Sequence, residues 1–124
     1  DAKKGVNMFQ LETINVPVLG IVENMAYFSP EELPENKYYI FGKEGAKSLA
    51  EQMNIELLAE IPLVQSVREA ADIGRPAVLQ GSTKIAIALS DLAKKVIENT
   101  EKRNSELEET KVVETSTTAG CSTN

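Results

Sequence analysis

The sequence predicts an α/β fold in which a few parallel strands are flanked by helices. Val16–Val22 is a short apolar run rich in β-branched residues, which is typical of a strand covered on both faces in a parallel sheet. Lys43–Met53 repeats apolar residues at helical spacing, and Ile55–Ile61 is a second apolar run. Strand, helix and strand in this order form one crossover unit, and 124 residues with 42% hydrophobic composition allow a modest core.

The first residues predict a helix. Ala2, Val6 and Phe9 fall at helical spacing, and we expect this helix to end near Thr13 or Asn15, before the first strand. The chain starts without methionine inside a helical pattern, which favours a piece cut from a longer protein.

The segment Ala26–Gly42 is irregular. Ser29-Pro30-Glu31-Glu32 has a capping residue, a proline and acids in the order of a single capped turn, which Pro34 stops. Aromatic, β-prone residues flank this turn on both sides. Two interpretations stay open, a hairpin arm across the turn and a surface loop pinned by its aromatic side chains.

The middle of the chain supplies the second strand and the elements around it. Asn54 is expected to close the Lys43–Met53 helix in a left-handed turn, and Pro62 to end the Ile55–Ile61 strand. Ser66 and Glu69 have the spacing of a capping box, which predicts a helix from Ser66 to Gly74.

The last predicted helix opens at Gly81-Ser82 and ends in a polar tail. Its apolar stripe consists of Ile85, Leu89, Leu92 and Val96. Glu, Lys, Ser and Thr dominate from Asn99 to Asn124, which predicts disorder. We therefore expect one domain over residues 1–98 and a disordered tail over residues 99–124.

Composition excludes several classes of function. The formal net charge is −6 and no basic stripe is interleaved with aromatics, so we expect no nucleic-acid partner and no membrane surface. The absence of histidine and the single cysteine, Cys121, exclude a disulfide framework and a Cys/His metal site. The simplest interpretation of this cysteine content is that the protein lies in a cytoplasmic, reducing compartment.

Ligands of open parallel sheets bind beyond the carboxyl ends of the strands, so a site should begin at Glu23 and Asn24 and include Pro62. An asparagine amide can both donate and accept, which suits the edge of an adenine ring, and a proline offers a flat apolar surface. Composition alone favours the alternative, in which Asn24 bonds its own backbone in a turn and Pro62 terminates a strand. The sequence contains no GxxxxGK[ST] loop, GxGxxG motif or nucleophile elbow, so the residues predict no catalysis.

Four stretches in a fixed order resemble a known family over residues 1–97. They read DAKKGVNMF, VPVLGIVENMAYF, YYIFGKEGAKSLAEQM and ELLAEIPLVQSVREAADIGRPAV. The chain resembles the carboxyl-terminal part of Mrp/ApbC-type P-loop ATPases, which carry iron–sulfur clusters and are relatives of MinD and ParA.

The resemblance implies that this part supplies the adenine pocket and that a missing amino-terminal half carries the phosphate loop and the magnesium-binding strand. Asn24 matches the family's base-contacting asparagine, and Pro62, Leu63 and Val64 match the stretch that lies along the base. For the full-length protein the resemblance implies ATP with magnesium, a homodimer and apo iron–sulfur client proteins. This chain alone is expected to be inactive.

One departure concerns the family's CPxC motif, whose thiolates bind a bridging cluster. Ser29 and Glu32 stand where the two cysteines would be, although Pro30 is kept. Oxygen ligands replace thiolates poorly on an iron–sulfur cluster, and Cys121 adds one thiol only. This departure argues against a bound cluster and predicts no metal site.

Three hypotheses therefore compete. The first is the adenine side of an iron–sulfur carrier ATPase, the second a part of a MinD/ParA-like regulatory or positioning ATPase, and the third a non-catalytic interaction domain. A glycine-rich GK[ST] loop upstream of Asp1 would support the first two, and a start codon at Asp1 the third.

Overall fold

The structure is a computed structural model that describes residues 1–30 and 32–111. Two strands, four α-helices and one short 3-10 helix are formed by these residues. In chain order they are α1 (Ala2–Phe9), β1 (Ile21–Phe28), α2 (Gly45–Met53), β2 (Leu57–Leu63), α3 (Gln65–Asp72), η1 (Ala77–Leu79) and α4 (Lys84–Glu106). The predicted α/β class is confirmed.

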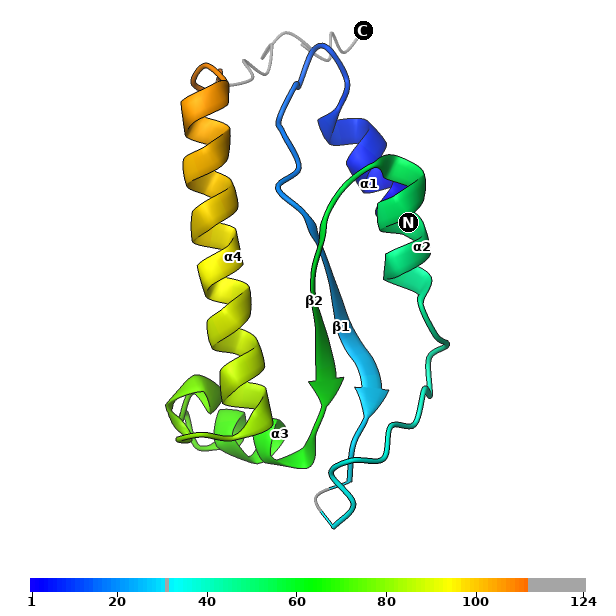
Figure 1. Cartoon of the computed structure of the whole chain (residues 1–124), viewed down its shortest axis with the longest axis vertical. Helices are drawn as coiled ribbons and strands as arrows, with labels where there is room; N and C mark the ends of the chain where they lie inside the picture. Colours follow the sequence, from blue (N-terminus) through cyan, green and yellow to red (C-terminus); the bar gives the residue numbers. More distant parts are fainter. Residues whose placement is uncertain (31, 112–124) are drawn as a thin grey trace, which may run out of the picture.

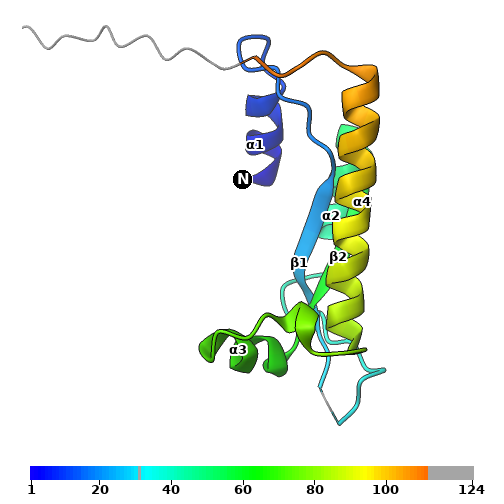
Figure 2. The same cartoon turned by 90° about the vertical axis from the view of Figure 1, so that its left-hand side faces the viewer.

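β1 and β2 pair in parallel, with α2 as the connection between them. Asn24 lies opposite Ile61 and Phe28 opposite Leu63. Figure 1 shows α4 along one side of the strand pair and α2 along the other, while α1 and α3 lie at opposite ends of the molecule. Figure 2 shows α3 projecting away from α4 at the carboxyl ends of the strands.

β1 begins five residues later than predicted, which is a correction to the Val16–Val22 strand. The apolar residues before Ile21 are half-buried but have no ladder partner, because β2 starts only at Leu57, opposite Ile21. Glu23 and Asn24 therefore lie inside β1 and not beyond its end. The strand accommodates Glu23 because its Oε1 accepts a hydrogen bond from the Ala46 N–H in the first turn of α2, at 3.4 Å.

Pro62 lies inside β2, so the prediction that it ends the strand is also wrong. The Leu63 carbonyl accepts from the Ser29 N–H on the β1 side at 3.4 Å, whereas the Leu58 carbonyl accepts from Lys95 Nζ at 2.9 Å on the α4 side. The backbone N–H and C=O groups of successive residues point to opposite edges of a strand, so the backbone nitrogen of Pro62 points away from β1. A residue without an N–H is tolerated at this free edge.

The core is small and lies between the sheet and its helices. Besides Pro62, eight apolar residues are buried in the described part of the chain: Val6, Ala26, Ala50, Leu58, Ile61, Ala70, Ile85 and Ala86. Gly20 is required at its edge, because a Cβ there would lie 2.3 Å from Cγ of Leu58. The absence of a side chain lets the segment before β1 pass directly over β2.

α4 has 23 residues and continues to Glu106, so the expected loss of order at Asn99 is wrong for residues 99–106. Asn99 Nδ2 donates to the Leu19 carbonyl at 3.0 Å and to Glu56 Oε2 at 2.9 Å. Composition does not reveal this tertiary anchor. Residues 112–124 of the predicted tail, with Cys121, lie outside the described residues, and the division at 98/99 stays a prediction.

The helix ends confirm one predicted cap and correct two. Asn54 closes α2 in the left-handed conformation, with φ 52°. α3 begins at Gln65 without a side-chain cap, and Glu69 accepts from Gln65 Nε2 at 2.7 Å, so Ser66 and Glu69 form no capping box. At α4 the capping residue is Thr83, whose Oγ1 accepts from the Ala86 N–H at 3.2 Å.

Within residues 1–30 and 32–111, no helix is long and apolar enough to cross a membrane.

Candidate functional site

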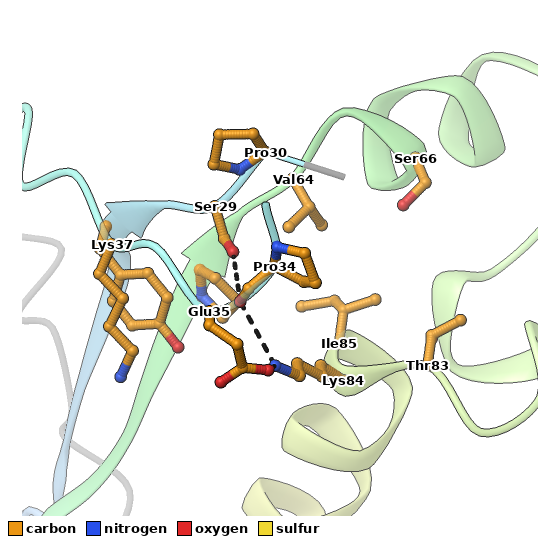
Figure 3. Close-up of a pocket in the computed structure, with 12 residues that line it drawn as sticks. Ser29, Pro30, Pro34, Glu35, Lys37, Val64, Ser66, Thr83, Lys84 and Ile85 are labelled. Atoms are coloured by element: carbon orange, nitrogen blue, oxygen red, sulfur yellow. Dashed lines mark hydrogen bonds and ion pairs between the residues drawn. The ribbon is translucent and has the colours of Figure 1, made fainter. Parts of the chain in front are cut away.

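A pocket of about 580 Å³ lies where the carboxyl ends of both strands meet the start of α4. Figure 3 shows side chains from three separate segments converging on it. Its lining residues are Tyr27, Ser29, Pro30, Pro34, Glu35 and Lys37 from the end of β1 and the following loop, Pro62, Val64 and Ser66 from β2 and α3, and Thr83, Lys84 and Ile85 from α4. The walls are mainly apolar and the charged side chains are exposed, an arrangement typical of small-molecule sites.

The loop side of the pocket is folded back on β1 by one antiparallel bridge. Phe28 and Tyr38 exchange two backbone hydrogen bonds, at 2.8 and 2.9 Å. The Tyr27 and Tyr39 rings meet edge to face with centroids 6.1 Å apart. The hairpin arm and the loop pinned by aromatic side chains, the two interpretations of this segment, are each correct in part. One antiparallel bridge and the aromatic contacts together hold the loop.

Two hydrogen bonds converge on the Pro34 carbonyl (Figure 3). Ser29 Oγ donates to it at 3.0 Å from the start of the loop, and Lys84 Nζ at 3.3 Å from the first turn of α4. Lys84 also forms an ion pair with Glu35, and its hydrogen bond and positive charge lower the pKa of the Glu35 carboxyl below its ordinary value. The loop is therefore tied to α4 at the rim of the pocket.

The structure brings only part of the predicted base site together. Pro62 and Val64 line the pocket, whereas Asn24 and Leu63 are not among its lining residues. Asn24 Oδ1 accepts from the Met25 N–H at 3.0 Å, beside a ladder irregularity at which Met25 has φ 56°. This local bond matches the alternative in which Asn24 bonds its own backbone, within a strand instead of a turn.

Several pocket residues were not found by sequence reasoning. Tyr27 belongs to the ENMAYF motif and lies two residues before Ser29, and this position in the sequence is the signal that could have identified it as a pocket residue. Glu35 and Lys84 are 49 positions apart, and no spacing rule connects them. Such pairs become visible only when the loop and the start of α4 are placed together.

The residues present do not fit an iron–sulfur cluster. Ser29 offers a hydroxyl that is already donating to the Pro34 carbonyl, and Glu32 is an exposed carboxylate. Among the residues that the structure describes, no group of three or more His, Cys, Asp or Glu side chains is placed to hold a metal ion. Hard oxygen ligands are in any case poorly suited to a cluster that thiolates normally hold.

The match to a family model shows the class of protein, a P-loop NTPase of the ParA type, in agreement with the resemblance noted above. Residues 1–97 match the family described as NUBPL iron-transfer P-loop NTPase, and the chain belongs to this family.

Named relatives agree with this assignment. The iron-sulfur cluster carrier protein of Synechocystis is 42% identical over 97 residues, which cover 77% of this chain and 27% of that protein. The iron-sulfur cluster transfer protein NUBPL of Mus musculus is 41% identical over 98 residues, covering 78% and 30%. The Arabidopsis thaliana iron-sulfur protein required for NADH dehydrogenase, mitochondrial, is 42% identical over 98 residues, with the same coverage of 78% and 30%. The chain thus spans less than a third of each relative.

Proposed function

We propose that this chain forms the adenine side of the nucleotide site in an ATP-binding iron–sulfur cluster carrier. The observation that carries the proposal is the pocket at the carboxyl ends of β1 and β2, which is lined by Pro62 and Val64. Family membership implies nucleotide binding, and the crevice beyond parallel strands is where such folds bind ligands.

The pocket has suitable dimensions and charge for this ligand. Its volume of about 580 Å³ falls within the range of roughly 300 to 1,000 Å³ found for small-molecule sites. Pro62 is buried and contributes a flat apolar surface, and Ile85 closes the pocket at the start of α4. Among the described lining residues there are two lysines, Lys37 and Lys84, and one carboxylate, Glu35, which favours an anionic ligand such as a nucleotide.

For the longer protein we propose ATP with magnesium as the ligand, a homodimer as the active form, and apo iron–sulfur proteins as clients. The Ser29–Glu32 stretch is proposed not to hold the cluster itself, because its side chains supply no thiolates. The cytoplasm remains our predicted compartment, and the mitochondrial Arabidopsis relative makes an organelle the alternative to test by localisation.

Titration of the 124-residue chain with adenosine tests the base pocket directly. Adenosine carries no phosphate, so its binding does not depend on a phosphate loop elsewhere in the protein. Val64→Arg places a large side chain in the pocket and is expected to abolish binding measured by calorimetry. Val78→Arg is the matched control, because Val78 is exposed in η1 outside the pocket. Equal binding by both variants, or none by the unmodified chain, would contradict the proposal.

Asn24 is tested separately, because its predicted base contact rests on the resemblance alone. If its amide pairs with the adenine edge, Asn24→Ala should weaken adenosine binding by about 1 kcal/mol, a typical net value for one hydrogen bond. The unfolding midpoint should hardly change, because its bond to the Met25 N–H is exposed. Unchanged binding with a lowered midpoint would show that Asn24 only supports the local backbone of β1.

A further inference from the structure

Of the described residues that line the pocket, Tyr27 is the one with an aromatic side chain. It lies near the end of β1 and is half-buried, and its ring contacts the edge of Tyr39 at an interplanar angle of 61°. The strand backbone and this aromatic contact together restrict the orientation of the ring. A fixed aromatic ring beside the flat Pro62 is a suitable surface for a planar ligand.

A charged side chain, that of Lys37, lies over the Tyr27 ring. Lys37 Nζ lies 4.4 Å from the ring centroid, and Lys37 itself lines the pocket. Among the ion pairs formed by the described residues, none involves Lys37, although, after the hydrogen bond and charge of Lys84, its charge is one of the causes that lower the pKa of the Glu35 carboxyl. A flexible, solvated lysine is easily displaced from such a position.

We propose that Tyr27 is the residue on which the base stacks in this pocket, and that the bound base takes the place over the ring that Lys37 now occupies. The inference rests on the proposed function, since it names how the same pocket holds its ligand. Stacking of a base on an aromatic side chain changes affinity by roughly 5- to 150-fold. An exposed cation–π contact contributes only about 2- to 5-fold, so stacking replaces it. The displaced ammonium then stays at the rim, where it meets the phosphates of a nucleotide.

Adenosine titration of ring variants tests this role. Tyr27→Leu removes the aromatic surface and should weaken adenosine binding at least about 5-fold, whereas Tyr27→Phe keeps the ring and should bind within twofold of the unmodified chain. Phe41→Leu is the matched control, because it removes a nearby ring that is exposed and does not line the pocket. Lys37→Gln should strengthen adenosine binding by about 2- to 5-fold, because the base no longer displaces a cation.

A second measurement keeps the test valid if Tyr27→Leu fails to fold, as judged by circular dichroism. In the unmodified chain, nuclear Overhauser contacts are expected between the adenine H2 or H8 protons and the Tyr27 ring. Binding without these contacts, or a Tyr27→Leu variant that folds and binds as tightly as the unmodified chain, would overturn the stacking role while leaving the base pocket intact. Absence of adenosine binding by the unmodified chain would overturn the pocket itself, and this inference with it.

Discussion

The two ends of the β1–β2 sheet are built from different kinds of contact. At the amino-terminal end, Gly20 passes in close contact with the buried Leu58, and Asn99 of α4 donates to the backbone carbonyl of Leu19. At the carboxyl end, a pocket is lined by buried residues such as Pro62 and Ile85 and by exposed charged ones, and the loop is tied to α4 by Lys84.

The exposed fractions make the contrast clear. Ile40 and Phe41, in the loop that follows the pocket, are 60% and 71% exposed, whereas Leu58 is 4% exposed. The amino-terminal end is fixed by steric fit and by backbone hydrogen bonds. The carboxyl end keeps apolar and charged groups accessible, as a binding surface requires.

The largest expected effect comes from breaking the fit at the amino-terminal end. Gly20→Ala brings a Cβ within 2.3 to 2.7 Å of three side-chain atoms of Leu58, which is buried and cannot move away freely. We expect a loss of about 2 to 3 kcal/mol in the free energy of unfolding, within the usual range for overpacking. Urea unfolding followed by circular dichroism measures it.

Gly5→Ala is the matched control, because nothing lies within 4 Å of a Cβ at Gly5 and the residue is in the interior of α1. Alanine there should be neutral or stabilise by about 0.5 to 1 kcal/mol. Equal effects of the two substitutions would contradict the steric role given to Gly20.

The second prediction removes the anchor that extends α4. Asn99→Ala leaves the Leu19 carbonyl and Glu56 without this donor, and should cost about 1 to 2 kcal/mol in unfolding free energy. Hydrogen exchange should rise in the last two turns of α4. Asn104→Ala is the control, since Asn104 is exposed and its side chain accepts from the neighbouring Arg103 and not from a distant segment among the described residues. Unchanged exchange in Asn99→Ala would show that the helix holds its length without the anchor.

At the amino-terminal end of the sheet, the sequence predicted the first strand but not the residue at which it begins. The apolar run from Val16 marked a strand, yet the ladder begins at Ile21, because pairing depends on where β2 starts. Periodicity of α2 and the left-handed Asn54 were predicted correctly, since both depend on residues close in the sequence. The extension of α4 depends on Asn99 reaching Leu19, a contact across 80 positions that no local pattern encodes.

The site was predicted in part for the same reason. The rule for parallel sheets predicted Pro62 at the crevice and the family resemblance predicted Val64, and both residues line the pocket. Asn24 was expected beyond the end of its strand, and the shift of β1 puts it inside. Tyr27 lies in β1, and Lys37 is brought to the same pocket by the fold of the loop, which includes the Phe28–Tyr38 bridge.

The smallest expected effect concerns the loop tie at the carboxyl end and its dependence on pH. Lys84 lowers the pKa of Glu35, so the ion pair is fully present above the ordinary pKa of a glutamate and is lost as the pH falls through the lower pKa of the folded state. Lys84→Met should raise the pKa of Glu35 toward its ordinary value, because both the hydrogen bond and the charge are removed. Carbon-13 shifts of the Glu35 carboxyl measure this change.

Both partners are exposed, so the same substitution should leave the urea midpoint almost unchanged. Lys94→Met is the control, because Lys94 pairs with Asp91 on α4 and lines no part of the pocket. Lys94→Met should leave the pKa of the Glu35 carboxyl unchanged. A Glu35 pKa that does not move in Lys84→Met, or one that moves equally in both variants, would mean that the tie is absent in solution. The carboxyl end of the sheet would then be open on the loop side as well, and the contrast between the two ends would be larger than the structure indicates.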